Sequence, residues 1–308
     1  MADPNSPAPH LRRVTVFGGT GFLGSRIARR FAEAGHAVQA VSRHPEDGER
    51  ISQPARVQPV RGDVTDRESV REVVRDADLV VNAVSLYLER GRATFQSIHV
   101  DGAERVADEA AKAGAAELVH ISGLGATPTA RDPYIRARGE GEVAVHRAFP
   151  DAVILRPSVM FAPHAGLLAT LADTAARMPV MPLFGLGETR LQPIHVEDVA
   201  QAVVCAAGHA EFRGTTQPLA GPTVYTYREL LDLVISETNT RSIPVPFPFA
   251  LWDFIAIVGE RLPDAPITRG QVALMRADST AEDSPLLTAC GIARQTVAAA
   301  LEQMHNSR

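Results

Sequence analysis

The stretch Val14-Thr-Val-Phe-Gly18-Gly19-Thr20-Gly21-Phe22-Leu23-Gly24 joins a short β-branched and aromatic run to an amphipathic helix through a turn of glycines. The run before the glycines is typical of a buried parallel strand. After them, Leu23, Ile27 and Phe31 recur at four-residue intervals, which places them on one face of a helix that Gly35 ends. The stretch therefore predicts a strand, a tight turn and a helix in direct succession.

The glycines of this turn predict a dinucleotide site. Gly18, Gly21 and Gly24 have the spacing that allows a tight turn, a close approach of the backbone to a pyrophosphate, and close packing of the helix on the sheet. The start of the helix offers free N–H groups and the positive end of the helix dipole. A glycine-rich turn without a ligand is the alternative. The residues predicted to bind the dinucleotide here are Gly18, Thr20, Gly21, Phe22, Leu23 and Gly24.

The first half of the chain alternates between strand and helix patterns. This alternation predicts an α/β fold, a Rossmann-type doubly wound parallel sheet with right-handed crossovers, followed by a smaller C-terminal mixed α/β lobe. Further strands are predicted at residues 37–42, 57–61, 79–82, 117–121 and 152–156, and helices at residues 65–75, 94–112 and 133–149.

The composition of the chain and the positions of its prolines and glycines suggest that it has three parts. Residues 1–10 carry three prolines and no apolar run, which predicts a flexible leader. Residues 11–160 form the predicted dinucleotide-binding Rossmann domain and residues 161–308 a smaller substrate or partner lobe, with re-entry of the chain into the first domain around 190–220 left open. In the second part, residues 194–204 predict a helix with Glu197 and Asp198 at its N-terminal end.

The charge and hydropathy of the chain exclude several partners. The net charge of -5 gives no attraction to nucleic acid. The longest apolar stretch, residues 247–259, is interrupted by Pro248 and Asp253 and is shorter than the ~20 residues that a membrane-spanning helix needs. No transmembrane segment is predicted. The wider segment 244–263 is rich in aromatics and prolines, and either a core role or an exposed docking patch remains open.

The cysteine content indicates a reducing compartment. Cys205 and Cys290 are the only cysteines, and they are too few and too far apart in sequence to predict a disulfide framework or a zinc cluster. The sequence therefore predicts a cytoplasmic protein with no metal site.

The end of the second strand bears on the choice of cofactor. An NAD site places an Asp or Glu there for the ribose 2′-hydroxyl, whereas here Ser42 is followed by Arg43, which suits a 2′-phosphate. NADP(H) is therefore favoured over NAD(H). The alternative is that Arg43 is a solvated loop charge, since Glu46 and Asp47 follow closely.

The carboxyl ends of the other strands face the same crevice in an open parallel sheet. Asp63 is predicted to contact the adenine, although a helix-entry turn explains it equally well, and the small Ala83 lets a dinucleotide lie close. The cofactor-binding residues predicted along this edge are Ser42, Arg43, Asp63, Val64, Asn82, Ala83, Val84, Ser122, Pro157 and Ser158.

Tyr134 and Arg138 are four residues apart and share a helical face. A phenol of pKa ~10 acts as a general acid or base near neutral pH only if a neighbouring cation lowers its pKa. Tyr134, Arg138 and Ser122 are therefore the candidate catalytic residues, and they also count as cofactor contacts. A partly buried tyrosine beside a surface arginine is the alternative. Gly139 and Gly141 in the same helix indicate that another backbone or a ligand approaches that face.

Taken together, these motifs resemble the extended and atypical short-chain dehydrogenase/reductase family, and within it the NADPH-binding accessory subunits of respiratory complex I and their bacterial relatives. The resemblance covers nearly the whole chain. It is carried by residues 18–24, 134–142, 149–158 and 193–200 and by Gly221-Pro222. It implies a Rossmann fold and a bound NADPH.

The chain departs from the family pattern at its catalytic positions. Active members are expected to use a Ser or Thr, a Tyr and a Lys, and only Tyr134 matches. Arg138 stands where the Lys belongs, and Leu124 where the hydroxyl belongs, which leaves Ser122 two residues early. Phe161-Ala162 likewise replaces the aromatic-Gly pair that often follows the Pro-Ser motif.

These departures favour a chain that binds the nucleotide without transferring hydride. The resemblance implies an NADPH in a structural or regulatory role, with protein partners in a membrane-associated respiratory or quinone-synthesis complex, at the inner face of the cytoplasmic membrane. Two alternatives stay open. One is an active NADP-dependent reductase or nucleotide-sugar epimerase or dehydratase that works through Tyr134, and the other is a scaffold that regulates a soluble partner.

Overall fold

The computed structural model describes residues 12–46, 56–238, 240–260, 267–282 and 284–306. The predicted leader at residues 1–10 lies outside the described residues, as does the end of the aromatic segment from residue 261.

A seven-stranded sheet forms the larger part of the fold, and the strand pattern predicts six of its strands but not β11. Its order is β11-β6-β5-β4-β1-β2-β3, and every neighbouring pair is parallel. The order reverses beside β1, so the crevice of this doubly wound sheet lies at the carboxyl ends of β1 and β4. The strands are β1 (Arg13–Phe17), β2 (Ala37–Ser42), β3 (Val57–Arg61), β4 (Leu79–Asn82), β5 (Glu117–Ile121), β6 (Val153–Pro157) and β11 (Thr216–Leu219).

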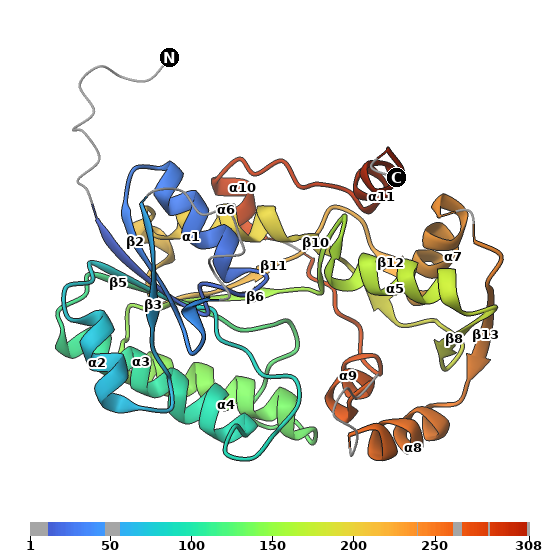
Figure 1. Cartoon of the computed structure of the whole chain (residues 1–308), viewed down its shortest axis with the longest axis horizontal. Helices are drawn as coiled ribbons and strands as arrows, with labels where there is room; N and C mark the ends of the chain where they lie inside the picture. The colour runs from blue at the N-terminus through green and yellow to red at the C-terminus, as the bar shows by residue number, and fades with distance from the viewer. Residues whose placement is uncertain (1–11, 47–55, 239, 261–266, 283, 307–308) are drawn as a thin grey trace.

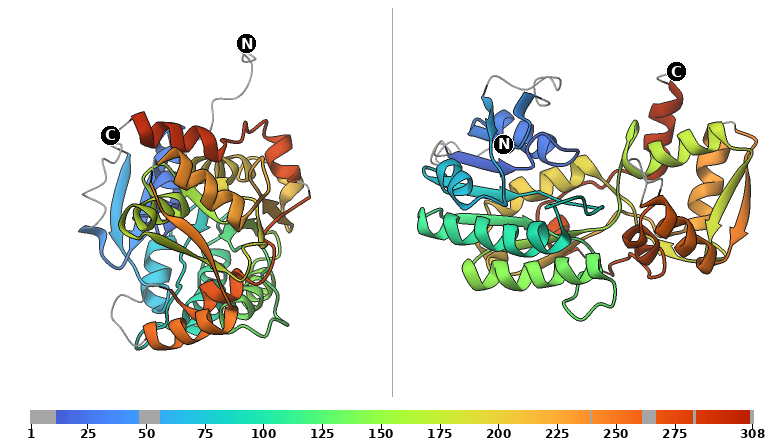
Figure 2. Two further views of the ribbon diagram at one scale, coloured as in Figure 1. Left: turned by 90° about the vertical axis from the view of Figure 1, so that its right-hand side faces the viewer. Right: turned by 60° about the horizontal axis from the view of Figure 1, so that its bottom comes forward.

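Helices cover both faces of this sheet (Figures 1 and 2). One face packs on α1, α6 and α10 through a core that includes Ile27, Val199 and Leu286. The other face packs on α2, α3 and α4 through a core that includes Val70 and Val106. The helices are α1 (Gly24–Glu33), α2 (Arg67–Val74), α3 (Asp101–Lys112), α4 (Pro133–Ala148), α6 (Val196–Ala206) and α10 (Pro285–Ala289), with a short 3-10 helix η3 (Ala210–Phe212).

The second lobe lies beside the carboxyl ends of the sheet and has its own apolar core, which includes Leu168, Leu230 and Trp252. Three two-stranded sheets frame it, with β7 paired to β10, β9 to β12 and β8 to β13. Its elements are β7 (Met160–Ala162), α5 (Gly166–Arg177), β8 (Val180–Phe184), β9 (Arg190–Leu191), β10 (Ile194–His195), β12 (Tyr225–Thr226), α7 (Tyr227–Glu237), β13 (Ile243–Phe247), α8 (Phe249–Gly259), α9 (Arg269–Leu274) and α11 (Val297–Asn306).

The helix predicted at residues 94–112 is divided in two. A π-helical turn, η2 (Gln96–Val100), precedes α3, and the Asp101 N–H donates to the carbonyl of Gln96. A π turn inserts one extra residue into the helical repeat, and the apolar spacing of the sequence does not register such an insertion.

The aromatic segment 244–263 is partly core and partly surface. Trp252 is buried, donates its indole N–H to the carbonyl of Leu183 at 2.9 Å, and stacks on Phe184 with ring centroids 4.3 Å apart. On the other side of α8, Leu251 and Phe254 are exposed, Phe254 to 64%. Some side chains of this segment therefore belong to the core, and others are exposed at the surface.

The cysteines contradict the expectation, drawn from their distance in sequence, that they do not form a disulfide. Cys205 and Cys290 are 85 residues apart in the chain, yet their Cα atoms lie 6.2 Å apart and their sulfurs form a disulfide. Their distance in sequence did not predict their distance in space because α10 returns to the sheet from the second lobe and packs against α6.

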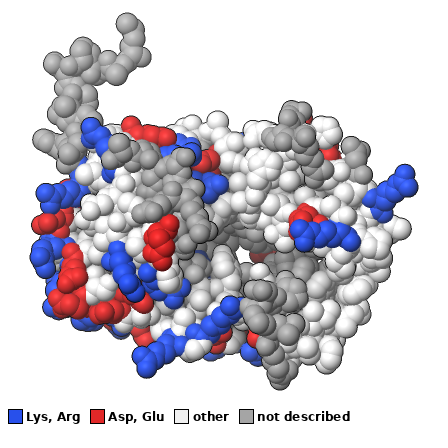
Figure 3. Space-filling view, viewed as in Figure 1, with Lys and Arg blue, Asp and Glu red and all other residues white. Residues whose placement is uncertain are grey.

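The charged side chains gather over the sheet-bearing half in the face that Figure 3 shows, whereas the second lobe is largely uncharged there. Among the described residues, no helix has the length and apolar character that crossing a bilayer requires.

The prediction from Gly139 and Gly141 is confirmed. A Cβ at Gly139 would lie 2.2 Å from the backbone carbon of Thr127, and one at Gly141 would lie 1.9 Å from the carbonyl oxygen of His99. Two backbone segments therefore rest directly on α4, and only glycine allows this approach.

We expect Gly141→Ala to lower the free energy of unfolding by about 2 kcal/mol, because the overpacking penalty exceeds the ~1 kcal/mol that alanine gains in a helix. Urea unfolding followed by circular dichroism measures this change. Val143→Ala, two residues on and 57% exposed, is the matched control and should change stability by less than about 0.5 kcal/mol. A Gly141→Ala chain as stable as the wild type would contradict the prediction.

Candidate functional site

The glycine turn after β1 is built by backbone contacts. The N–H groups of Gly18 and Gly19 both donate to the carbonyl of Val41 at the end of β2. Gly18 has a φ of 76°, and a Cβ there would lie 2.9 Å from the carbonyl oxygen of Ala83. A Cβ at Gly24 would lie 2.0 Å from the carbonyl oxygen of Gly18. The turn is thus pressed against two strand ends and against the first turn of α1.

Gly21 has a different environment. It is exposed, and a Cβ there would meet only the carbonyl oxygen of Gly18, at 3.2 Å. Helix α1 starts just after it, and within the described chain its N-cap residue, Leu23, has no side-chain hydrogen bond and its first turn has no acidic residue. Uncapped N–H groups beside an open glycine fit a bound phosphate. The side chains of Phe22 and Leu23 pack into the core, so their contribution to such a site is through the backbone.

Two arginines lie at the far edge of this crevice. Arg43 is exposed just after β2, and Arg61 ends β3, where it is the register partner of Ser42. The Ser42 hydroxyl is buried and has no hydrogen-bond partner among the described residues. The parallel register therefore brings a second guanidinium, which the sequence analysis missed, to the edge at which Arg43 was predicted to bind a 2′-phosphate.

Asp63 serves the helix entry. Its Oδ1 accepts hydrogen bonds from the backbone N–H and the hydroxyl of Thr65, at 2.9 and 2.8 Å. Asp66 caps α2 by accepting from the N–H of Glu68. Val64 beside it is buried. The structure thus supplies the turn that was the alternative explanation for Asp63.

At the end of β4, Asn82 shapes the chain that faces the glycine turn. Its Oδ1 accepts from the Val84 N–H at 3.2 Å. This bond turns the backbone so that Ala83 lies against Gly18.

Tyr134 and Arg138 meet at the same crevice. Arg138 Nη1 donates to the Tyr134 hydroxyl at 3.0 Å and to the Ser85 hydroxyl at 3.2 Å. Ser85 follows β4, three residues after Asn82, and the sequence analysis did not select it. The hydroxyl that accompanies Tyr134 therefore comes from the β4 loop, whereas Ser122 was the candidate.

Three other predicted residues lie at the ends of β5 and β6. The Ser122 hydroxyl is buried and has no partner within the described chain. Pro157 accepts from the Leu124 N–H through its carbonyl. The Ser158 hydroxyl donates to the carbonyl of Ser279, which fixes the segment that returns from the second lobe.

An aromatic cage surrounds Tyr134. The rings of Tyr87, Phe95 and His99 lie with their centroids 5.4 to 5.7 Å from its ring, and Gly270 of α9 packs on its Cβ. This burial raises the pKa of Tyr134 to about 12, although the neighbouring Arg138 charge acts in the opposite direction. At neutral pH the phenol is therefore protonated.

Two buried histidines lie on the same side of the sheet. Burial, aided by the positive charge of Arg138, lowers the pKa of His99 to about 4 and that of His120 to about 3. His99 holds the β4 loop through a 2.9 Å contact between its Nε2 and the carbonyl of Leu86. Both rings are neutral at physiological pH, so Arg138 is the cation of this cluster.

These residues fit a dinucleotide. The open Gly21, the uncapped start of α1 and the unpartnered Ser42 hydroxyl and Arg138 Nε are polar groups that a nucleotide can satisfy. When bound, a nicotinamide dinucleotide would supply hydride chemistry at this crevice.

Comparison with known proteins agrees with this geometry. Residues 14–217 match the NAD dependent epimerase/dehydratase family. The chain belongs to that family. Binding of an NAD(P) dinucleotide is a property of the family to which this chain belongs.

Among its relatives, this epimerase/dehydratase family member is 32% identical over 244 residues to the mitochondrial NADH dehydrogenase [ubiquinone] 1 alpha subcomplex subunit 9 of Arabidopsis thaliana, covering 77% of this chain and 61% of that protein. The chain thus spans about three fifths of that relative. It is also 32% identical over 196 residues to the ceramide reductase of Caulobacter vibrioides, covering 62% of this chain and 59% of the reductase.

A solved structure supports the fold. The dTDP-glucose 4,6-dehydratase of Streptomyces venezuelae, solved with NAD bound, matches with a TM-score of 0.72 at 17% identity, over 96% of this chain and 97% of that one. At this identity the likeness establishes the Rossmann-like architecture and its smaller C-terminal region.

We predict that His120 makes the fold sensitive to acid. Its pKa in the folded chain, about 3, is below the ~6.5 of an unfolded chain, so between these values the unfolded chain binds a proton that the folded chain does not. Stability from this group is therefore lost as the pH falls below 6.5, by about 2 kcal/mol between pH 7 and pH 5.

Urea unfolding of the wild type and His120→Gln at both pH values measures this dependence. The variant should lose less stability than the wild type on the same shift of pH. His164→Gln, at an exposed position, is the control and should leave the difference between the two pH values unchanged. An equal loss in the wild type and in His120→Gln would contradict the prediction.

Proposed function

We propose that the chain binds NADP(H) and retains it in a structural or regulatory role. The observation that carries this proposal is the state of Tyr134, a buried phenol whose pKa is raised to about 12 and whose hydroxyl is bonded to a permanent cation. A general acid or base works best with a pKa near the operating pH, and this phenol is far from it.

The chemistry of Arg138 is a second argument for this proposal. A lysine ammonium can relay a proton and is compact, whereas a guanidinium stays charged and has a planar fork of donors. Here the guanidinium donates hydrogen bonds to the hydroxyls of Tyr134 and Ser85, and its Nε remains available to an acceptor. The arrangement favours binding of ribose or phosphate oxygens over proton transfer.

The similarity to a subunit of NADH dehydrogenase supports a role as a subunit of a larger complex. The Arabidopsis relative is named as a subunit of NADH dehydrogenase, and the identity covers 77% of this chain. We propose that this chain associates with a membrane-bound respiratory or quinone-related complex from the cytoplasmic side. The exposed apolar side chains of α8, among them Leu251 and Phe254, supply a surface suited to a protein partner.

An active NADP-dependent reductase is the second candidate, and Ser85 is the observation that favours it. A hydroxyl is present on the β4 loop, where Ser85 is bonded to the same guanidinium as Tyr134. The Caulobacter relative is named as a reductase. The two candidates differ in whether a bound NADPH is oxidised.

We expect the pair Arg43 and Arg61 to select NADPH over NADH. Charged hydrogen bonds to a phosphate contribute roughly 1.5–3 kcal/mol, so Arg43→Ala should weaken NADPH binding about 10- to 100-fold and leave NADH binding nearly unchanged. Arg61→Ala should act in the same direction. Fluorescence titration with both nucleotides measures the affinities.

Arg56→Ala is the matched control for this experiment. Arg56 lies at the opposite end of β3, where its Nη1 bonds the carbonyl of Gly35 at 2.6 Å, so its loss should affect neither nucleotide. Equal weakening of NADPH and NADH by Arg43→Ala would reject the phosphate role.

The decisive test of function is the nucleotide that freshly purified protein releases on denaturation, together with its fate in the native protein. We expect NADPH in near-stoichiometric amount, with no oxidation when quinones, aldehydes or ceramide-type lipids are added. Arg138→Lys, which restores the family's Tyr-x-x-x-Lys pattern, should raise NADPH oxidation at least about tenfold, since a lysine contacts the phenol as a compact cation.

The alternative gives the opposite result. If the chain is a reductase that uses Arg138, the wild type oxidises NADPH with one of these substrates and Arg138→Lys slows it. Thermal melting of both proteins checks that the exchange leaves the fold intact.

A further inference from the structure

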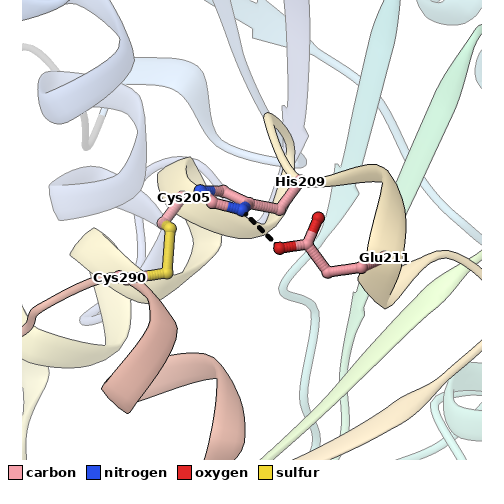
Figure 4. Close-up of a disulfide and its surroundings, with 4 residues drawn as sticks. All are labelled: Cys205, His209, Glu211 and Cys290. Atoms are coloured by element: carbon pink, nitrogen blue, oxygen red, sulfur yellow. Dashed lines mark hydrogen bonds and ion pairs between the residues drawn. A yellow bond between two sulfur atoms is a disulfide. The ribbon is translucent and has the colours of Figure 1, made fainter.

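The disulfide lies away from the dinucleotide crevice, on the face of the sheet that α6 and α10 cover. Cys205 is in the last turn of α6, and Cys290 caps the end of α10. A ring nitrogen of His209 and the two sulfurs all lie within 4.8 Å of one another. Figure 4 shows the imidazole between Cys205 and Glu211.

His209 is held in place by a carboxylate. Its Nδ1 is 2.8 Å from Oε1 of Glu211, which fixes the ring orientation and leaves the other nitrogen for the sulfurs. Cys205, His209 and Cys290 are each partly exposed. A thiol in solution can therefore reach the bond, which a fully buried structural disulfide would prevent.

The helix ends determine what happens when this bond opens. Both cysteines lie at helix C-termini, where the dipole is negative and a thiolate is disfavoured. A sulfur that leaves the disulfide must therefore be protonated promptly. His209 is the titratable group whose ring nitrogen is beside both sulfurs.

Residues 290–295 are attached to α6 at two points, and the disulfide is one of them. Gln295 donates its backbone N–H to Asp198 in the first turn of α6 and contacts His195, the N-cap residue of α6, through its side-chain amide. Cys290 binds the last turn of the same helix. Residues 290–295 thus run along α6 and are attached at both of its ends. Opening the disulfide removes the covalent link at the α10 end, where Leu286 and Leu287 remain packed in the core.

We propose that Cys205–Cys290 is a reversible thiol–disulfide exchange site for a dithiol, that His209 protonates the leaving sulfur, and that reduction frees α10 from α6. One thiol of the dithiol transfers its proton to His209 and attacks one sulfur as a thiolate, and the other sulfur leaves and takes that proton from the His209 imidazolium. The second thiol of the dithiol then displaces the first. The dithiol is oxidised to a disulfide with loss of two electrons and two protons, and both cysteines become thiols.

Equilibration of the full chain with mixtures of reduced and oxidised dithiothreitol, followed by alkylation with a mass tag, tests the exchange. We expect both cysteines to become labelled together under native conditions, and to be re-oxidised when the ratio is reversed. Reduction only after unfolding in denaturant would overturn the proposal. Native thiols that retain a zinc ion and resist oxidation would also overturn it.

The role of His209 is tested with His209→Gln. The reduction rate should fall about tenfold or more, since positioned proton transfer contributes at least that much, while the reduced-to-oxidised ratio at equilibrium stays the same. His44→Gln is the matched control, because His44 makes the same contact with Glu46, at 3.2 Å, away from both cysteines. Equal rates for His209→Gln and the wild type would remove His209 from the exchange.

Hydrogen exchange tests the release of α10 and needs no substitution. The amides of Cys290 and Ile292 donate to the carbonyls of Leu286 and Leu287 in the oxidised chain. Reduction of the wild type should speed their exchange at least tenfold, with a smaller change at Gln295, which keeps its contacts to Asp198. Identical exchange in both redox states would show that the bond does not control α10.

Discussion

The site depends on close contact between backbones at positions where a side chain would not fit. Gly18 and Gly24 let the β4 loop and the first turn of α1 close around the phosphate turn, and Gly139 and Gly141 let two further segments rest on α4. The second contact places the carbonyl of His99 on the helix that carries Tyr134. As a result, close backbone contacts fix both the glycine turn and the cluster around Tyr134 to the elements that surround them.

This packing also sets the electrostatics of the crevice. Tyr134, His99 and His120 are buried near α4, and burial favours the neutral form of each. Arg138 is left as the charge among them, with its Nε lacking a partner in the described chain. Glu142, one turn further on, is already bonded to Arg156. A ligand with oxygen acceptors would satisfy this guanidinium, whereas proton transfer at the same place would have to work against the burial.

The sequence predicts those parts of the fold and site that depend on neighbours in the chain. The six strands, the glycine turn and the Tyr134–Arg138 pair follow from spacings of a few residues. Ser85 and Arg61 reach the crevice through loop packing and strand register, and Cys205 meets Cys290 because the chain returns from the second lobe. No local pattern marks these three, since each depends on how separate segments come together.

Helix α6 contacts elements of both proposed sites, the nucleotide site and the thiol–disulfide exchange site. Its Glu197 forms ion pairs with Arg26, Arg29 and Arg30 of α1, the helix that starts at the phosphate turn. The same helix also holds the returning segment through Asp198 and the disulfide. Any ligand that binds only the folded chain stabilises every element on which its site depends. The proposed nucleotide at the start of α1 and the disulfide at the end of α6 would therefore act on one packed pair of helices. Under this proposal, retention of the nucleotide has a structural consequence without hydride transfer.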